Sequence, residues 1–289
     1  MDGLLLAMLN KRRRDLINRF PQVACFAFDH ISTEIMVRGR FERAALELLC
    51  SQIFTRMKNR RLCLDVGANI GNHSLAFAGH FARVLAFEPN PRTFKLLAIN
   101  AELAANVMPY KLGASNRKDT IAAYEDALNL GATTTVRSIA EHRAQNQKGV
   151  IGTVQFDVDR LDRVLGATDL HQVDFVKLDV EGHEAAALEG MEAILRASSP
   201  IIAMEALVDG FKDGTLLSVE ILKSHGYTHF YGLEGTRHDS AGLPRIVRKP
   251  CRRLRKLLGS DMKRYTMSRL ESIEPRYHRM LVCSKDEVI

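Results

Sequence analysis

One stretch of the chain decides the fold: Arg61-Leu62-Cys63-Leu64-Asp65-Val66-Gly67-Ala68-Asn69-Ile70-Gly71-Asn72-His73-Ser74. An apolar run ends at Asp65, a loop of small residues follows, and a helical pattern begins at Asn72. This order predicts a strand, a tight turn and a helix N-terminus. Gly67 and Gly71 allow the backbone to turn sharply and to approach a ligand, and Asn69 is among the few residue types that tolerate a positive φ. The loop therefore predicts a site that can hold a nucleotide.

The spacing of the loop residues indicates which nucleotide binds. A dinucleotide-binding fold uses Gly-x-Gly-x-x-Gly, so that a pyrophosphate can sit on the helix N-terminus, but here Asn69 replaces the second glycine. The Asp65 carboxylate, just ahead of the loop, would repel a pyrophosphate and attract a cationic ligand. The next predicted strand, 83–88, ends in Glu88, at roughly the twenty-residue interval at which an acid meets ribose hydroxyls. These two acids favour a ligand with a ribose and a positive charge, and S-adenosylmethionine has both.

Four motifs, taken in order, resemble FkbM-type S-adenosylmethionine-dependent methyltransferases. They are Asp65-Val66-Gly67-Ala68-Asn69-Ile70-Gly71, Phe87-Glu88-Pro89-Asn90-Pro91, the Asn100 that closes the next predicted helix, and Lys177-Leu178-Asp179-Val180-Glu181-Gly182-His183-Glu184. The resemblance runs from about Ile31 to Glu205, with a weaker match at the C-terminal strand. It implies an α/β fold of the Rossmann-like class I methyltransferase type. Such a fold has a mostly parallel, seven-stranded twisted sheet with helices on both faces and an antiparallel C-terminal strand. The alternation of strand and helix patterns favours the same kind of sheet.

The 289 residues are enough for one large α/β domain with attachments, and no linker rich in Pro, Gly or Ser divides them. We expect an N-terminal helical and short-strand cap (1–60), a core that binds S-adenosylmethionine (61–234), a basic helical insertion (235–275) and a closing strand of the core (276–289). Local patterns predict further elements. They are an antiparallel pair in 22–39, a helix over 40–59, a strand over 106–114, an irregular polar segment over 115–153, a strand over 153–158, a helix from 184 to 195, and hairpin arms at 226–231 and 277–283.

Cysteine usage and the N-terminus bear on localisation. The five cysteines are odd in number and scattered, and they form neither a disulfide framework nor a metal-ligand spacing, which predicts a reducing cytoplasm. Cys63 and Cys283 lie in apolar runs and are expected to be small core residues. The apolar N-terminus precedes its basic residues, Lys11 to Arg14, and lacks a cleavage site, which argues against a signal peptide. We expect an amphipathic helix docked on the domain, with a contact to a membrane surface as the alternative.

The positive charge is concentrated near the C-terminus. Residues 245–279 contain twelve Lys and Arg against three acids, a net +9, so the rest of the chain carries −2 of the total of +7. Apolar residues at helical spacing predict two short helices here, one around Leu254 and Leu258 and one over 262–273, with Ser260 as an N-cap. Such basic helices can pack on their own domain, contact an anionic membrane or a lipid-linked substrate, or bind nucleic acid. We rank these three in that order.

Because ligands of open parallel sheets bind at the carboxyl ends of the strands, the cofactor site can be assembled from the resemblance. It implies that Asp65 and the Gly67 to Gly71 backbone hold the methionyl part and that Glu88 accepts hydrogen bonds from the ribose. The full set of expected cofactor-binding residues is Asp65, Gly67, Ala68, Asn69, Gly71, Glu88, Pro89, Asn90, Gly113 and Ala114. Gly39 to Glu42 matches a family element, and Glu42 either helps to close this pocket or is an exposed acid at a helix start.

The expected catalytic residues are Asp179, Glu181 and His183. Methyl transfer is an in-line displacement, so placement of the acceptor matters most, and a hydroxyl acceptor also has to lose its proton. Asp179 would assist as general base or as a metal ligand. Glu181 and His183 would orient the acceptor. A divalent metal held by Asp179, Glu181 and Glu205 suits oxygen ligands, although no metal-binding motif is present.

Each of these residues also has a structural interpretation. Asp179 can be a helix N-cap, Glu181 and Glu184 can complement a helix dipole, and His183 can be a surface histidine. His73 is expected to be structural. The patch Leu128 to Ala132 resembles a family turn near the acceptor pocket, and without the resemblance it is an ordinary loop.

The leading functional hypothesis is an O-methyltransferase that acts on a hydroxyl of a saccharide or of a glycosylated or lipid-linked metabolite, an acceptor class that comes from the resemblance. A polyketide-type acceptor is an alternative. A nucleic-acid methyltransferase draws only on the basic segment, because Asp179-Val180-Glu181-Gly182 stands where amino-methylating families carry Asp/Asn-Pro-Pro-aromatic. A non-catalytic cofactor-binding module is the third hypothesis, and the intact loop and both acids argue against it.

Overall fold

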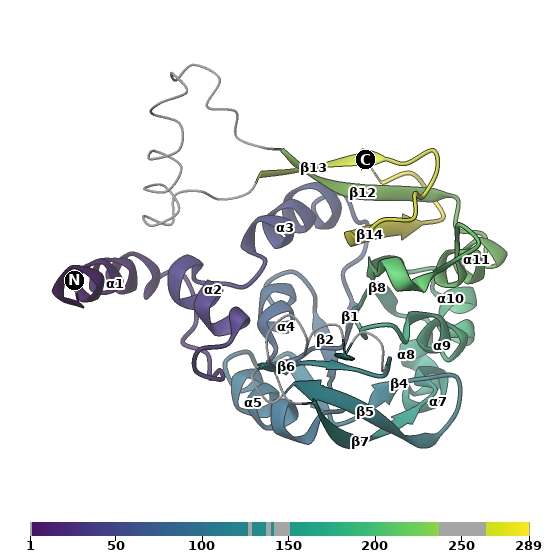
Figure 1. Ribbon diagram of the computed structural model, residues 1–289. Helices are drawn as coiled ribbons and strands as arrows, with labels where there is room; N and C mark the ends of the chain where they lie inside the picture. The colour runs from purple at the N-terminus through teal and green to yellow at the C-terminus, as the bar shows by residue number, and fades with distance from the viewer. Residues whose placement is uncertain (1, 127–128, 137–139, 142–150, 237–263, 289) are drawn as a thin grey trace.

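The computed structural model describes residues 2–126, 129–136, 140–141, 151–236 and 264–288. Its central feature is an eight-stranded mixed sheet in the order β13-β12-β14-β9-β8-β1-β2-β3 (Figure 1). Its strands are β1 (Leu62–Val66), β2 (Arg83–Phe87), β3 (Val107–Tyr110), β8 (Val173–Leu178), β9 (Ile201–Ala206), β12 (His229–Thr236), β13 (Arg264–Arg269) and β14 (His278–Ser284).

The pairing confirms the predicted class I sheet. Strands β3, β2, β1, β8 and β9 are parallel neighbours, whereas β14 runs antiparallel to both β9 and β12. Every residue of β1 is buried, as expected for a parallel strand with both faces covered. The addition to the predicted seven strands is β13, which pairs antiparallel with β12 at the edge of the sheet.

Helices pack on both faces of the sheet, each against its own apolar cluster, because successive strand residues point to opposite faces. One cluster joins Leu62, Leu64 and Val66 to α7 (Leu161–Val164), α9 (Glu184–Glu189), α10 (Glu192–Ala197) and α11 (Leu217–Ser224). The other joins Cys63 to α3 (Arg43–Leu48), a π-helix (Leu49–Phe54), α4 (Asn72–Phe77) and α5 (Pro91–Ala101). Cys63 and Cys283 are fully buried, which confirms them as core residues.

A second, smaller sheet corrects two predictions. Its order is β4-β7-β5-β6, with β4 (Gly113–Ala114), β5 (Asp119–Asp126), β6 (Asn129–Thr134) and β7 (Ile151–Asp159). The predicted strand over 106–114 is therefore divided between β3 and β4, which belong to different sheets. The irregular segment predicted over 115–153 is wrong for β5, β6 and the start of β7. Only Ala123, Phe156 and Val158 form the buried centre of this sheet, as far as the described residues go, so its apolar pattern is short and easily hidden by polar residues.

The N-terminal part is helical where the sequence favoured a strand pair. Residues 30–38 form α2 (His30–Arg38) instead of the antiparallel pair predicted in 22–39. Asp29 caps the start by accepting from the backbone N–H of Ser32, and Gly39 ends the helix in the left-handed conformation, so the caps outweigh the β-branched content. The helix predicted over 40–59 is confirmed as α3 and the π-helix that continues it.

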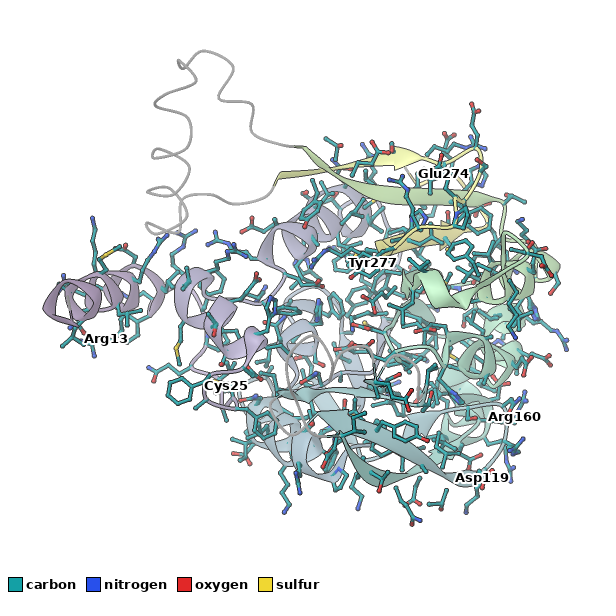
Figure 2. All side chains as sticks on the ribbon, viewed as in Figure 1. Arg13, Cys25, Asp119, Arg160, Glu274 and Tyr277 are labelled. Carbon is teal, nitrogen blue, oxygen red and sulfur yellow. The ribbon has the colours of Figure 1, made fainter. Side chains whose placement is uncertain are left out.

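Helix α1 (Asp2–Leu16) contacts α2 and projects from the body of the molecule, with Arg13 on its exposed side (Figure 2). Its large apolar side chains include Leu6, which is 61% exposed. Among the described elements, the main contact of α1 is with α2, within the N-terminal part. Within the described ranges, none of the helices has the length and hydropathy that a membrane span requires.

The C-terminal region also differs from expectation. The helix predicted over 262–273 is wrong for residues 264–269, because Tyr265 and Met267 alternate onto the core from strand β13. The helix predicted around Leu254 and Leu258 lies outside the described residues. The helix predicted from 184 to 195 is interrupted at Gly190, where a Cβ atom would lie 1.9 Å from the carbonyl oxygen of Ser115.

Two short helices and one small hairpin complete the described elements. They are α8 (Ala167–Leu170), the 3-10 turn Val208–Gly210 and the pair β10 (Phe211–Lys212) and β11 (Thr215–Leu216). These elements connect the layers and do not line the candidate site.

Candidate active site

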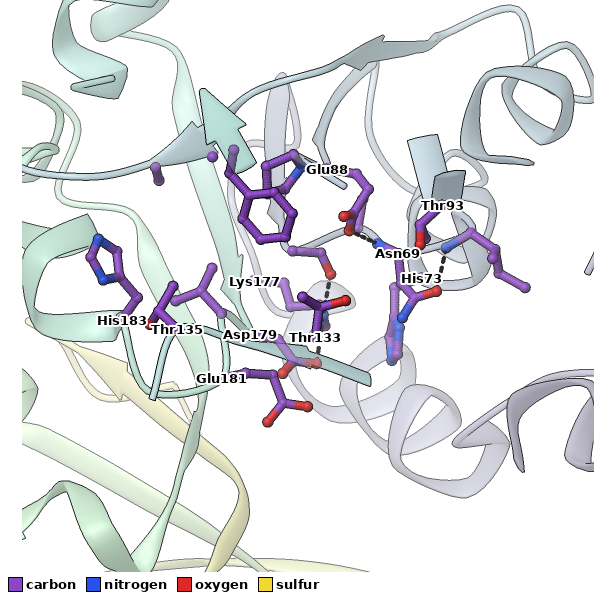
Figure 3. Close-up of a pocket in the computed structure, with 18 of the residues that line it drawn as sticks. Asn69, His73, Glu88, Thr93, Thr133, Thr135, Lys177, Asp179, Glu181 and His183 are labelled. Carbon is purple, nitrogen blue, oxygen red and sulfur yellow. Dashed lines mark hydrogen bonds and ion pairs between the residues drawn. The ribbon is translucent and has the colours of Figure 1, made fainter. Parts of the chain in front are cut away.

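A cleft of about 960 Å³, partly open to solvent, lies at the carboxyl ends of β1, β2 and β8. The small sheet and the N-terminal part complete its walls (Figure 3). Ten of the predicted site residues line it: Gly67, Ala68, Asn69, Glu88, Pro89, Gly113, Ala114, Asp179, Glu181 and His183.

The glycine loop has the backbone conformation that its sequence predicts. Gly67, Asn69 and Gly71 all have positive φ, at 79°, 53° and 87°. A Cβ atom on Gly67 would lie 1.8 Å from the carbonyl oxygen of Asp179, so the loop can pass this point only with glycine. The backbone N–H groups of Gly67 and Ala68 both donate to the carbonyl of Phe87. The loop is thereby fixed between the ends of β2 and β8.

Glu88 stands at the end of β2 with its carboxylate against the loop. One oxygen accepts from the backbone N–H of Asn69 and the other from that of Asn90, each at 2.9 Å. Each carboxylate oxygen has two lone pairs, so both retain capacity for ribose hydroxyls. Burial raises the pKa of Glu88 to about 7, although the two backbone hydrogen bonds favour the ionised form. The prediction that Glu88 faces the pocket agrees with this geometry.

Asp65 departs from its predicted place. It is fully buried and does not line the cleft, because its carboxylate points under the loop to helix α4 and to Lys177. The hydroxyl of Ser74 donates to Asp65 Oδ2 at 2.6 Å, and Lys177 Nζ lies 3.7 Å from Oδ1. Asp65 was predicted to contact the methionyl group, but the structure places its carboxylate beneath the loop, where it supports α4 and Lys177.

Lys177 is a site residue that sequence reasoning left without a role. It is paired with Asp65 across β1 and β8, lines the cleft, and lies with Nζ 3.0 Å from Asp179 Oδ2. Burial lowers the pKa of Lys177, but the charges of Asp179 and Asp65 outweigh burial and raise it above its ordinary value. Its place two residues before Asp179 on a parallel strand was a usable signal, since both side chains then point to the same face.

Three carboxylates meet at one end of the cleft, where Asp179 and Glu181 line it and Glu205 lies just behind them. One ligand atom from each of Asp179, Glu181 and Glu205 lies within 4.8 Å of the others. Tyr277 on the segment before β14 donates to Glu205 Oε1 at 2.6 Å. Burial, with the charges of Asp179 and Glu181, raises the pKa of Glu205 well above its ordinary value. Such a group can accept a proton, bind sugar hydroxyls or hold a hard cation.

The predicted catalytic residues are not all brought together. Asp179 and Glu181 belong to the carboxylate cluster, and Asp179 pairs with Lys177 instead of capping α9. His183 lines the same cleft, but its Nε2 lies 3.0 Å from the hydroxyl of Ser115. Burial lowers the pKa of His183. His183 lines the cleft (Figure 3) but does not belong to the carboxylate cluster.

Two other predicted cofactor residues support the cleft without lining it. Gly71 turns the loop into α4, where a Cβ atom would lie 2.8 Å from Leu97 Cδ1. Asn90 caps α5 by accepting from the backbone N–H of Arg92 at 2.9 Å, and its amide donates to Thr133 Oγ1 at 3.1 Å. Their expected contact with the cofactor is thus indirect.

The N-terminal part supplies a wall that the sequence did not define. Ile31, Phe41 and His73 line the cleft, and the Phe41 and His73 rings meet edge to face at 6.5 Å. The Glu42 side chain is only 12% exposed, with Oε2 lying 3.4 Å from His73 Nε2, and it forms an ion pair with Arg279 on β14. The interpretation of Glu42 as an exposed helix-start acid is wrong. The expected structural role of His73 is incomplete, because His73 also lines the cleft.

The small sheet supplies the remaining wall. Ile121, Phe156 and Val158 give it an apolar surface near Pro89, which suits an adenine ring, whereas Thr133 and Thr135 of the β6 segment add hydroxyls. An apolar wall, a carboxylate with free lone pairs and a loop that permits close approach fit an adenosine group. The sequence analysis did not predict this wall, because residues 115–153 carry no long periodic pattern.

Sequence comparison agrees with the geometry. The sequence profile of the methyltransferase FkbM domain matches residues 65–233. The chain belongs to the FkbM methyltransferase family. The matched range contains the glycine loop, Glu88 and the three clustered carboxylates, whereas Ile31, Phe41 and Glu42 of the FkbM chain lie ahead of it.

Individual relatives of this FkbM-family chain include the hexuronic acid methyltransferase AglP of Haloferax volcanii. It is 32% identical over 158 residues, which cover 54% of this chain and 60% of AglP. Methyltransferase 1 of Beauveria bassiana is 31% identical over 146 residues, 45% of this chain and 57% of the relative. The chain thus matches about three fifths of the length of these relatives. A solved FkbM methyltransferase from Methylobacillus flagellatus has a TM-score of 0.40 at 18% identity, covering 79% of this chain and 56% of that one.

Proposed function

We propose that the protein is an S-adenosylmethionine-dependent O-methyltransferase whose acceptor is a hydroxyl of a saccharide or of a glycosylated or lipid-linked metabolite. The observation that carries the proposal is the joint placement of Glu88, the glycine loop and the Asp179 carboxylate in one cleft. Membership of the FkbM family supports the same activity.

The residues of the cleft fit this cofactor. Glu88 would accept hydrogen bonds from the ribose, the apolar wall of the small sheet would cover the adenine, and the Gly67 to Asn69 backbone would lie against the methionyl part. When bound, the cofactor supplies an electrophilic methyl group on a sulfonium. The acidic surroundings of the cleft favour that positive charge.

Asp179 is placed to assist the acceptor. Its carboxylate would take the proton of the acceptor hydroxyl as the oxygen bonds to the methyl carbon and the carbon–sulfur bond breaks. Lys177, 3.0 Å away, fixes the orientation of the carboxylate. Glu181 and His183 would orient the acceptor, Glu181 by holding a neighbouring hydroxyl and His183 from the part of the cleft where its Nε2 meets the Ser115 hydroxyl. Rate acceleration would come largely from this alignment.

A saccharide acceptor has two supports. Clustered carboxylates are good acceptors for the vicinal hydroxyls of a sugar. The relative AglP is named as a hexuronic acid methyltransferase, and its match includes more than half of this chain. For the basic segment 245–279, packing on its own domain stays the first proposal, which the core contacts of Tyr265 and Met267 support, and contact with an anionic membrane or a lipid-linked acceptor stays the second.

Asp179 can act as a base or as one ligand of a hard cation shared with Glu181 and Glu205. Turnover of EDTA-treated enzyme, with and without added Mg²⁺, separates the two roles. Turnover that survives EDTA assigns Asp179 as the base, and turnover restored only by Mg²⁺ assigns it as a ligand.

Asp179→Asn tests the proposal as a whole. The probes are methyl-labelled S-adenosylmethionine with a panel of neutral glycosides, glucuronides and polyprenyl-linked sugars. We expect labelled product with the wild type and a loss of roughly 100-fold or more with the variant, while S-adenosylhomocysteine binding is retained. Undiminished turnover of the variant would remove Asp179 from the mechanism. A folded wild type that binds neither form of the cofactor would overturn the proposed function.

A further inference from the structure

Strand β6 crosses from the cofactor side of the cleft to the acceptor side. Thr133 and Thr135 line the cleft, and Thr134 between them is only 2% exposed. No sequence motif assigned a role to these three threonines. Their hydrogen bonds connect β6 to two loops that carry site residues.

Thr134 contacts the acceptor-side loop through its hydroxyl. The hydroxyl donates to the carbonyl oxygen of Glu181 at 2.7 Å and accepts from the backbone N–H of Val136 at 3.1 Å. The group is therefore used both as donor and as acceptor in a buried position. Loss of a buried partner leaves a polar group unsatisfied, which is costly compared with an exposed hydrogen bond.

The carbonyl that Thr134 holds belongs to a strained piece of backbone. Glu181 has φ of 52° and the following Gly182 has φ of 98°, so two successive residues are left-handed. An L-residue in this region is strained, so the conformation needs support from its surroundings. The turn directs the Glu181 carboxylate toward Asp179 and Glu205, and the Gly182 N–H donates to Glu184 Oε1 at 3.1 Å.

The neighbouring threonine contacts the cofactor-side loop. Thr133 Oγ1 accepts from the side-chain amide of Asn90 at 3.1 Å, and the backbone N–H of Asn90 donates to Glu88 at 2.9 Å. A continuous set of bonded groups thus runs from Glu88 through β6 to Glu181. The hydrogen bonds of β6 thus fix the distance between the loop that carries Glu88 and Asn90 and the loop that carries Glu181.

We propose that Thr134 is a positioning residue: its hydroxyl fixes the left-handed turn at Glu181 and Gly182 and so holds the acceptor-side carboxylates in their working arrangement. The inference rests on the proposed function, because the acceptor is what these carboxylates would orient. Thr134 acts through Glu181 and does not itself contact the reacting atoms. The cofactor half of the cleft does not depend on this bond.

Three variants test the inference. Thr134→Val keeps the shape and removes the hydroxyl, and Thr134→Ser keeps the hydroxyl. Thr120→Val is the matched control, because Thr120 on β5 of the same sheet is exposed and its hydroxyl donates to Asp157 at 3.0 Å, away from the cleft. The measurements are hydrogen–deuterium exchange of amides 180–184, calorimetric titration with S-adenosylhomocysteine, and kcat and KM with the acceptor found in the panel.

With Thr134→Val we expect exchange at 180–184 to rise and kcat to fall, each by roughly tenfold. Its Kd for S-adenosylhomocysteine should stay within about twofold of the wild type, and Thr134→Ser and Thr120→Val should behave like the wild type. Wild-type exchange and wild-type kcat in Thr134→Val would overturn the inference, as would a fall in affinity for S-adenosylhomocysteine equal to the fall in kcat. Failure of the proposed function is distinguishable, because the wild type itself would then bind no S-adenosylhomocysteine, while the exchange at 180–184 would still report on the Thr134 bond.

Discussion

At the scale of single residues, the carboxylate of Glu88 sets the pH dependence that we expect on the cofactor side of the cleft. Its pKa of about 7 lies above the ordinary 4.5 because the carboxylate is buried. The folded chain therefore keeps the Glu88 proton at pH values where the unfolded chain has lost it. The stability that this proton contributes is present below about pH 4.5 and is lost as the pH rises toward 7.

Ligand binding should have the opposite pH dependence. Ribose hydroxyls donate to the ionised carboxylate, so S-adenosylhomocysteine should bind more tightly as Glu88 loses its proton, by up to about tenfold per pH unit below 7. Calorimetry at pH 6 and pH 8 measures this slope. Glu88→Gln should bind more weakly at pH 8 and lose most of the slope, whereas Glu102→Gln at the exposed end of α5 should match the wild type. A slope unchanged in Glu88→Gln would show that another group is responsible.

At the scale of elements, the glycine loop depends on close backbone contact as well as on φ. Gly67 and Gly214 have nearly the same φ, 79° and 77°, but a Cβ atom would meet a backbone oxygen at 1.8 Å at Gly67 and nothing within 4 Å at Gly214. Gly214→Ala should therefore cost only the backbone strain, about 1 kcal/mol. Comparing an alanine at Gly67 with an alanine at Gly214 therefore separates the effect of backbone strain from that of a steric clash.

We expect Gly67→Ala to displace the loop from Asp179, because a backbone oxygen cannot yield as a flexible side chain can. The variant should lose S-adenosylhomocysteine binding by roughly 100-fold or more, about 2.7 kcal/mol, while Gly214→Ala keeps it. Urea unfolding and calorimetry on both variants measure the two effects. Equal affinities in the two variants would show that the close approach of the loop to the end of β8 does not control cofactor binding.

The same elements show how far sequence reasoning extends. Apolar runs such as β1 and β2 were predicted within a residue or two, and so were the loop positions that have positive φ. Prediction failed where a local cap or a tertiary contact decides. Asp29 and Gly39 turn a β-branched segment into α2, and Met267 reaches the core from a strand. Lys177 lies in a recognised motif, but its role could not be predicted because two of its acidic neighbours, Asp65 and Glu42, come from distant segments of the chain.

At the scale of the whole molecule, a residue of the N-terminal part and a residue of the closing strand meet beside the site. Arg279 on β14 forms an ion pair with the largely covered Glu42 ahead of α3, and Glu42 in turn faces His73 of the cleft. Burial alone would raise the pKa of Glu42, but the contact with His73 and the charge of Arg279 outweigh it and bring the pKa to about 2. The N-terminal wall of the cleft is thus held by the closing strand.

Arg279→Ala should leave the Glu42 carboxylate, which is 12% exposed, with its charge only partly compensated. We expect the free energy of unfolding at pH 7 to fall by roughly 2 to 4 kcal/mol. Arg276→Ala is the control, because Arg276 is 53% exposed and pairs with surface acids, which should cost under about 1 kcal/mol. Urea titration of both variants gives the comparison. Similar losses in the two would mean that the Glu42 pair does not hold the wall.

The most direct test of the central claim is calorimetric titration of the wild-type protein with S-adenosylhomocysteine at pH 8, where Glu88 is ionised. The cleft geometry predicts one micromolar-range site per chain, with affinity that falls in Glu88→Gln. Absence of binding to folded wild-type protein would contradict the assignment of the cleft to this cofactor and, with it, the proposed methyl transfer.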